Sequence, residues 1–267
     1  MKTNVLKVVA ILASAIACHA SALAADPRLG LRHYVGEGVG FEDSFTSFEW
    51  FQPLYDTQVD TTFMDFHPII DNRGNYAQNL GLGYRNYLPN VDRVFGVFGY
   101  YDLRQAPDNE IEDEDEMFHQ LSLGVDTIGK HWDFRSNIYM PFEQEEEPVL
   151  PGFDMEFGLA LPVPFDAHGY VGWYGFEEDE NDTVFGIRGR VEGKVTDNVT
   201  LGLELNDDAL FGTTLNFRVA WYFRGFKPYL GFGCGDACHG TAYQRLATPV
   251  ERNYLIAMQP REFDRDD

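Results

Sequence analysis

The sequence has little cysteine, little basic charge and, after its first residues, no long apolar run. Cys18 lies in the amino-terminal segment, which leaves Cys234 and Cys238 as the only cysteines of the remaining chain. There are 20 lysines and arginines against 43 acidic residues, a formal net charge of −23. The chain therefore lacks the basic surface that nucleic acid and anionic headgroups need in a general partner. No later segment could form an apolar helix of ~20 residues, which excludes a helical membrane protein.

The first 24 residues are typical of a secretory signal peptide. They combine a basic start (Lys2, Lys7), an apolar run (Val8–Ala17) and a signal-peptidase motif (Ala22-Leu23-Ala24). The apolar run is shorter than the ~18 residues of a spanning anchor, so we expect cleavage and a mature protein that begins near Ala25. Retention of Cys18 as a lipoprotein anchor is disfavoured, because Ala15 stands where a larger aliphatic residue is usual.

What the sequence has in abundance is short segments with a period of two residues. Leu215, Phe217 and Val219, for example, alternate with Asn216 and Arg218, so one face of the strand is apolar and the other polar. Aromatic residues make up 15% of the chain and glycine contributes 26 residues, as in all-β folds with many tight turns. Alternation alone is shared by soluble sandwiches and membrane barrels. The expected strands are Leu31–Gly38, Ser44–Tyr55, Thr61–Ile69, Gln78–Leu88, Arg93–Leu103, Met117–Thr127, His131–Phe142, Phe153–Val163, His168–Phe176, Thr183–Val195, Val199–Asn206 and Thr213–Phe223.

The number, length and connections of these strands favour an all-β fold, an antiparallel twelve-stranded transmembrane β-barrel of the outer membrane. Twelve is even, as in closed bacterial barrels, and most segments approach the ~9–11 residues of a tilted spanning strand. Links such as Pro89–Asp92 and Ile128–Lys130 are short, whereas the alternate links are mostly longer. Short turns at one rim and long loops at the other are the outer-membrane pattern, with the long loops outside the cell.

The longer links contain many of the acidic residues. Four stretches, Asp108–Glu116, Glu143–Glu147, Glu177–Asp182 and Asp207-Asp208, hold 18 of the 43 acidic residues and no basic residue. All four fall on the expected outer rim, where they would concentrate cations. Weak Ca²⁺ or Mg²⁺ association is the only cofactor expectation, since no ordered calcium-loop spacing occurs. The acidic loop residues are Asp108, Glu110, Glu112, Asp113, Glu114, Asp115, Glu116, Glu143, Glu145, Glu146, Glu147, Glu177, Glu178, Asp179, Glu180 and Asp182.

Charged residues also occur at positions that would face the inside of the barrel. A protein-filled soluble core could not bury so many charges cheaply, whereas a wet lumen could hold them. Eight-stranded barrels are filled by side chains and sixteen-stranded barrels leave a channel, so an open and a filled lumen are both compatible with twelve strands. The expected lumen-facing charges are Arg85, Asp133, Arg135, Asp154, Glu156, Arg188, Arg190, Glu192, Lys194, Glu204 and Arg218.

An ordered series of fragments resembles a known family. The fragments are "FEWFQPLYDT" (Phe48–Thr57), "NLGLGYRNYLPN" (Asn79–Asn90), "VFGVFGYYDLR" (Val94–Arg104), "LSLGVD" (Leu121–Asp126), "WDFRSNIYMPF" (Trp132–Phe142) and "YQRLATPVERNYLIA" (Tyr243–Ala257). In this order and spacing they resemble the translocator barrel of inverse autotransporters, the intimin and invasin adhesins. The resemblance covers most of the mature chain and implies a twelve-stranded barrel in the outer membrane of a didermic bacterium. It also implies insertion by the barrel-assembly machinery, with periplasmic chaperones as earlier partners.

The resemblance assigns a role to the residues after the last strand. In the family, that segment runs back through the pore as a linker and delivers a carboxyl-terminal passenger to the cell surface. This sequence has the linker-like stretch Arg224–Met258 but only Gln259–Asp267 after it, so we expect a barrel without a passenger. The expected domains are a signal peptide (1–24), the barrel (25–223) and a linker-like tail (224–267). Whether the tail lies in the lumen or in the periplasm stays open.

The tail contains the motif "FGCGDACHG". In an oxidising compartment, Cys234 and Cys238 would form a disulfide that closes a small loop, although their short spacing is unfavourable. A metal site of Cys234, Cys238 and His239 is the alternative, and it lacks a clear fourth ligand.

Catalysis is not expected. Outer-membrane enzymes need a Ser, His and Asp constellation at the outer rim or lipid face, whereas the histidines are scattered and no G-x-S-x-G motif occurs. The expected function is an outer-membrane barrel of inverse-autotransporter type with a structural or pore-forming role and cation-favouring loops. The alternative is a translocator or adhesin component whose surface activity lies in the loops or in a separate partner. Outer-membrane lipid is the expected surrounding, and the oligomeric state stays open.

Overall fold

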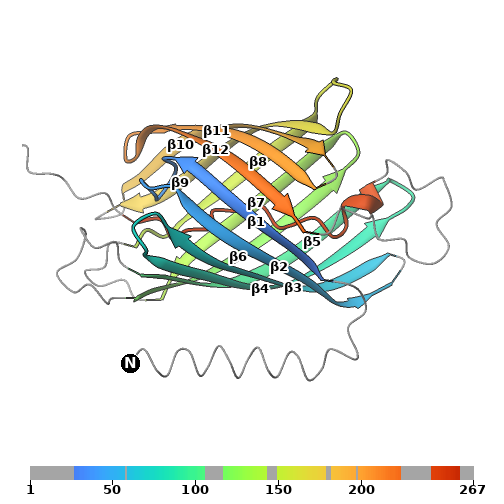
Figure 1. Ribbon diagram of the computed structural model, residues 1–267, viewed down its shortest axis with the longest axis horizontal. Coiled ribbons are helices and arrows are strands. Elements are labelled where there is room, and N and C mark those ends of the chain that lie inside the picture. The colour runs from blue at the N-terminus through green and yellow to red at the C-terminus, as the bar shows by residue number, and fades with distance from the viewer. Residues whose placement is uncertain are drawn as a thin grey trace, which may run out of the picture.

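Twelve antiparallel strands form one closed barrel in the computed structural model, which describes residues 27–57, 59–105, 117–142, 149–178, 182–196, 198–223 and 242–258 (Figure 1). Each strand pairs with its neighbours in the sequence, and the first strand closes the barrel on the last. The expected fold is therefore confirmed, and every strand lies within three residues of its expected bounds. The strands are β1 (Arg28–Gly36), β2 (Phe45–Asp56), β3 (Asp60–Asp71), β4 (Tyr76–Leu88), β5 (Arg93–Gln105), β6 (Met117–Gly129), β7 (Trp132–Pro141), β8 (Gly152–Ala160), β9 (Ala167–Glu178), β10 (Asp182–Thr196), β11 (Val199–Asp208) and β12 (Gly212–Tyr222).

The alternation of side chains along the strands is inverted relative to a soluble protein. On β10, Phe185 and Ile187 are 65% and 66% exposed, while Arg188 and Arg190 are buried. Because successive residues of a strand point to opposite faces, the apolar face of the sheet points outward and the charged face points into the barrel. An outward apolar band with a polar interior is the arrangement of a barrel that sits in lipid.

The two ends of the barrel are different. One end, which we call the short-turn rim, holds the links between β2 and β3, β4 and β5, β6 and β7, β8 and β9, and β10 and β11. The other end, the long-loop rim, holds the remaining links, among them residues 37–44 between β1 and β2. In the described part of the chain, no helix is long and apolar enough to cross a membrane.

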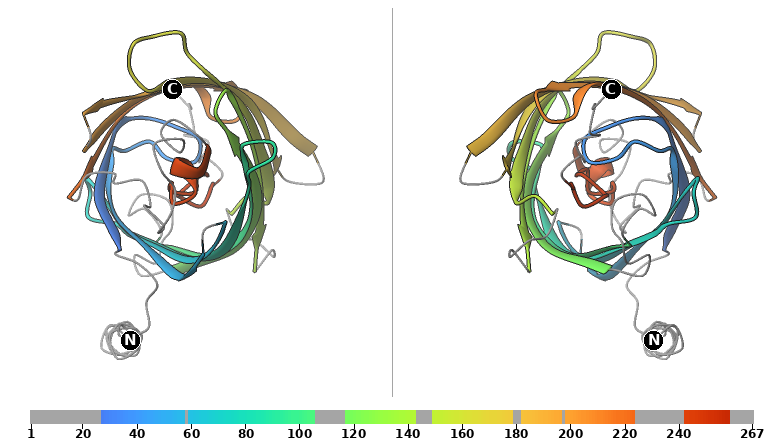
Figure 2. Two further views of the ribbon diagram at one scale, coloured as in Figure 1. Left: turned by 90° about the vertical axis from the view of Figure 1, so that its right-hand side faces the viewer. Right: turned by 90° about the vertical axis from the view of Figure 1, so that its left-hand side faces the viewer.

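A segment after the last strand runs through the inside of the barrel. We call residues 242–258 the lumen segment, and the end views in Figure 2 show it inside the ring of strands. It begins with the short 3₁₀ helix η4 (Ala242–Arg245) at the short-turn rim, where the backbone N–H of Ala242 donates to Asp92 at 2.9 Å. It ends at the long-loop rim, where Met258 forms a β-bridge with Val149. The lumen segment therefore traverses the barrel from one rim to the other.

Candidate functional site: the occupied lumen

The structure gathers the expected lumen-facing charges into networks on the inner wall. Arg190 donates to Glu156 at 2.6 Å, and Arg135 contacts the same carboxylate at 3.3 Å. Arg85 pairs at 2.5 Å with Asp126, a partner that the sequence did not single out. Of the eleven expected charges, the half-buried ones are Glu192, Lys194 and Glu204, and the buried ones are Arg85, Asp133, Arg135, Asp154, Glu156, Arg188, Arg190 and Arg218.

Glu251 of the lumen segment lies among the arginines of one wall. Its carboxylate accepts from Arg218 of β12 at 2.8 Å and from Arg32 of β1 at 3.3 Å, and it lies 3.8 Å from Arg190 of β10. Three guanidinium groups from three strands thus share one carboxylate. Removing that carboxylate would leave mutually repelling cations in a region of low dielectric constant.

Two arginines of the lumen segment pair with carboxylates on another part of the wall. Arg252 donates to both oxygens of Asp102 on β5, at 2.8 and 2.5 Å. Arg245 donates to both oxygens of Asp133 on β7, at 2.7 and 2.5 Å. Paired N–H donors matched to one carboxylate are the strongest form of such an ion pair. The wall and the lumen segment therefore have complementary charges at three places.

Wall arginines also bind the backbone of the lumen segment. Arg85 donates to the carbonyl oxygen of Leu246 at 3.1 Å and also to that of Thr248. Arg104 donates to the carbonyl oxygen of Ile256 at 2.5 Å. These contacts satisfy carbonyl groups that have no sheet partner, as buried backbone requires.

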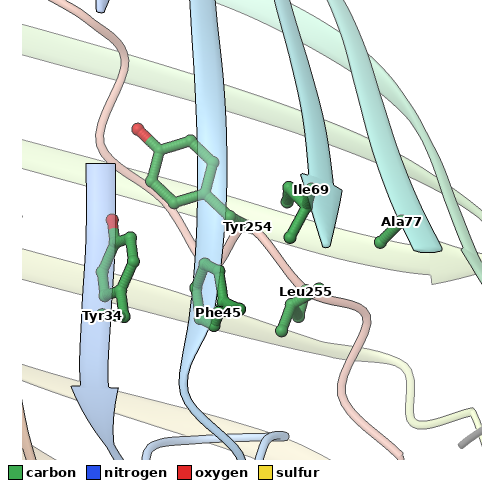
Figure 3. Packing of buried hydrophobic residues seen from close by; sticks show 6 residues of the cluster. All are labelled: Tyr34, Phe45, Ile69, Ala77, Tyr254 and Leu255. Atoms are coloured by element: carbon green, nitrogen blue, oxygen red, sulfur yellow. The ribbon is translucent and has the colours of Figure 1, made fainter. Parts of the chain in front are cut away.

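Each of the five buried apolar clusters contains residues of the lumen segment. Tyr254 and Leu255, for example, pack against Tyr34, Phe45 and Ile69 (Figure 3). The other four clusters include Ala257 in one, Val250 in the next, Ala242, Tyr243 and Leu246 in another, and Ile256 and Met258 in the last. The described core of the protein is therefore built between the wall and the lumen segment.

The link between β1 and β2 covers the end of the lumen segment at the long-loop rim. Gly38 and Phe41 form a β-bridge that folds this link into a turn. Gly40 lies within it at a φ of +78°, and a Cβ atom there would lie 2.7 Å from Cα of Ala257. Arg104 donates to the carbonyl oxygen of Gly40 at 2.6 Å and so holds the turn beside the segment.

A serine, a histidine and an aspartate that the sequence left apart come together on the inner wall. Ser47 Oγ lies 3.4 Å from His67 Nδ1, and His67 Nε2 lies 3.0 Å from Asp65. All three residues are at most 1% exposed, and the ring of Tyr254 lies 4.8 Å from the ring of His67. A nucleophile needs access to its substrate, and this hydroxyl has none.

Several expected features lie partly or wholly outside the described residues. Outside the described residues lie Cys234, Cys238 and His239, together with the acidic residues of 108–116, 143–147 and 179–180. Glu177 is exposed, and the backbones of Glu178 and Asp182 belong to β9 and β10. Asp208 accepts from the backbone N–H groups of Leu210 and Phe211 at 2.7 and 2.5 Å. In the part of the chain that the structure describes, no three His, Cys, Asp or Glu residues are grouped as metal ligands.

The most important residues that the sequence did not single out belong to the lumen segment and its partners. Asp102 and Arg32 stand at inward positions of alternating strands, so period two was a usable signal for them. Arg245, Glu251 and Arg252 lie in a segment without alternation. Their partners lie between 33 and 219 positions away in the sequence, and the pairing follows only from the closed barrel.

The geometry defines a class of protein, a closed twelve-stranded barrel that carries apolar side chains outside and a charged, occupied interior. Residues 27–176, more than half of the chain, match the family described as "Inverse autotransporter, beta-domain". The chain belongs to this family of outer-membrane barrels, and the expected resemblance is confirmed. No curated protein matches the sequence.

One solved structure shows the same fold at low identity, and a second is more distantly similar. A chain solved in work described as "Unveiling the Mechanism Behind the in-meso Crystallization of Membrane Proteins" superposes with a TM-score of 0.66 at 17% identity, over 87% of this chain and 99% of that chain. The COG4313 outer membrane channel from Pseudomonas putida F1 gives a TM-score of 0.49 at 15% identity, over 76% of this chain and 98% of that one. The first likeness supports the barrel fold, and the second is too distant to carry an argument.

Proposed function

We propose that the protein is a structural outer-membrane barrel of inverse autotransporter type whose pore is closed by its own lumen segment. The observation that carries this proposal is the presence of lumen-segment residues in all five buried clusters. Three charged contacts, through Arg245, Glu251 and Arg252, add to this packing. A segment held along its length by both apolar and ionic contacts blocks the path of a solute.

The proposal includes cation-favouring loops at the outer rim. The strand ends that flank the acidic stretches, such as Gln105, Met117, Glu178 and Asp208, all lie at the long-loop rim. Carboxylates concentrated there would attract cations, and weak Ca²⁺ or Mg²⁺ association at the surface follows from the same charge.

The proposal also includes the route by which the protein reaches the outer membrane. Removal of residues 1–24, passage with periplasmic chaperones and insertion by the barrel-assembly machinery are the steps expected of an exported barrel of this family. Amino-terminal sequencing of protein from purified outer membranes tests the first step, with Ala25 as the expected first residue. Catalysis is not proposed, because Ser47 is buried and the ring of its neighbour His67 lies against that of Tyr254.

Single-channel recording in planar bilayers tests the proposed closure. The full chain should show little steady conductance, and a variant that lacks residues 242–267 should open larger, discrete channels. If neither protein conducts, the barrel does not contain a pore that the lumen segment closes. If both conduct equally, the lumen segment does not block the pore. If the deletion variant does not fold, Glu251→Gln replaces it in the same recording. Loss of this carboxylate should loosen the lumen segment and give brief channel openings. The control is Arg73→Gln, which changes an exposed residue and should give no such openings.

Translocation is the second candidate function. The lumen segment enters at the short-turn rim and reaches the long-loop rim, where Leu150 N–H donates to the carbonyl oxygen of Ala257 at 3.0 Å. Such a path could carry attached polypeptide to the cell surface. An epitope appended after Asp267 should then be detected by antibody on intact cells, and detection only after permeabilisation would contradict this role.

A further inference from the structure

A cavity of about 380 Å³ lies at the short-turn rim between the wall and the lumen segment. The wall side comes from β1, β7, β9, β10, β11 and β12, and the inner side includes Thr248 and Pro249. This volume lies within the range of small-molecule sites. The cavity is separate from the acidic long-loop rim and from the Ser47 cluster.

The cavity is lined by many cationic side chains in a strongly acidic protein. Three carboxylates, Asp166, Glu192 and Glu251, share the lining. The carboxylate of Glu251 forms salt bridges with both Arg32 and Arg218. The cationic residues are Arg28, Arg32, Arg135, Lys194, Arg218 and Arg245.

Carboxylates behind this lining balance much of the charge. Glu49 pairs with Arg32 at 2.8 Å, Asp133 with Arg245 at 2.5 Å and Glu156 with Arg135 at 3.3 Å. These pairs fix the guanidinium groups in place without a bound ligand. The site is therefore preorganised, with several N–H donors on one side of a polar cavity, which is the arrangement that recognises oxyanions.

His168 lies at the edge of this cavity. It lines the cavity and is 8% exposed, and its Nε2 is buried without a hydrogen-bond partner among the described residues. Its other ring nitrogen lies 3.5 Å from Asp166, and its ring stacks on Tyr170 with 6.1 Å between centroids. Buried polar atoms are nearly always paired, so Nε2 is an unsatisfied group beside the cavity, but it has too little accessible surface to contact a ligand there directly.

We propose that this cavity binds a small oxyanion, inorganic phosphate or a phosphate monoester, at the short-turn side of the barrel. Lys194 and the wall arginines supply its polar contacts. The hydroxyl groups of Thr200 and Thr248 on the same lining suit the hydroxyls of an attached sugar or glycerol. Because Arg245 belongs to the lumen segment, the bound anion favours the state in which the segment is in place. The site does not depend on whether the empty barrel conducts.

Calorimetric titration of the full chain in dodecyl maltoside micelles tests the proposal, with inorganic phosphate as the probe. We expect saturable binding of one phosphate per chain. Lys194→Gln should weaken this binding by about tenfold or more, the usual effect of losing one charge-assisted hydrogen bond. The matched control is Lys130→Gln, which removes the same charge from an exposed turn of the same rim and should leave the affinity unchanged.

A second variant provides an independent test in case Lys194→Gln does not fold. Thr200→Trp fills the cavity without removing a charge and should abolish binding. Absence of saturable binding in the unmodified protein overturns the proposal, as does equal weakening by Lys194→Gln and Lys130→Gln. Titration with short-chain phosphatidic acid separates two sources of the ligand: tighter binding than phosphate identifies a lipid headgroup, and weaker or equal binding identifies a free phosphate.

Discussion

Arg252 of the lumen segment and Asp102 of β5 form a paired ion contact inside the barrel, with N–O distances of 2.8 and 2.5 Å. Both side chains are 1% exposed, and the guanidinium group also lies 4.5 Å from the ring centroid of Tyr100. Two residues separated by 150 positions in the sequence thus meet in a water-poor interior. This contact ties the segment to the wall at mid-length.

Breaking this buried pair should cost far more than breaking an exposed one. Arg252→Gln leaves the carboxylate of Asp102 buried without its counter-charge, and we expect a loss of about 3–5 kcal/mol in the free energy of unfolding. The control is Arg73→Gln, which breaks the half-exposed Arg73–Asp43 pair of 2.6 Å and should cost less than about 1 kcal/mol. Urea titration in lipid vesicles measures both. Equal small losses would show that Arg252 is solvated.

The apolar side of the lumen segment should matter as much as its charges. Leu246 is 1% exposed among Val94, Ile128 and Tyr243, so Leu246→Ala should open a cavity and lower the free energy of unfolding by about 2–5 kcal/mol. Leu203→Ala on the outer face, where the side chain is 50% exposed, should cost less. If the two variants unfolded at the same urea concentration, the packing of η4 against the wall would be contradicted.

Two glycines separate a steric effect from a backbone effect. Gly40 and Gly74 have φ values of +78° and +97°, so alanine at either position costs about 1–2 kcal/mol for the left-handed conformation. A Cβ at position 40 also meets Ala257, whereas one at position 74 has nothing within 4 Å. Gly40→Ala should therefore lower the unfolding midpoint more than Gly74→Ala. Identical midpoints would mean that the β1–β2 link does not cover the lumen segment.

The acidic outer loops should set ion selectivity once the barrel is open. In the variant that lacks residues 242–267, changing every Asp and Glu of 108–116 to Asn and Gln should reduce the preference for cations, read as a reversal potential closer to zero. The effect should shrink at 1 M salt, where the Debye length falls to about 3 Å. Asp166→Asn on the other rim is the control. Unchanged reversal potentials after loop neutralisation would refute the role of these charges.

The strands were predictable from sequence because lipid outside and charge inside impose a strict period of two, as Phe185, Ile187, Arg188 and Arg190 show on β10. The number of strands followed from the alternation of short and long links. The position of the lumen segment was not predictable in this way, since an irregular segment has no period to read. Its partners, such as Asp102 for Arg252, become neighbours only when the barrel closes.

The candidate site was predictable in part. The charges of β7, β8, β10 and β12 were identified as facing the lumen, whereas an open and a filled lumen were both compatible with the sequence. In the structure they pair with one another and with Arg245 and Glu251. A sequence shows which face of a strand is polar, whereas the identity of each ion-pair partner depends on register across the barrel and on what enters the lumen.

A charge-swap cycle on Asp102 and Arg252 tests the central claim most directly. Asp102→Arg and Arg252→Asp should each destabilise the folded barrel, since each places like charges together in a buried site. If the lumen segment occupies the barrel, the double variant should regain most of the lost free energy of unfolding, with a coupling energy within the ~0.5–3 kcal/mol expected of contacting residues and near its upper end. A double variant that loses the sum of the two single effects would contradict the placement of the segment in the lumen.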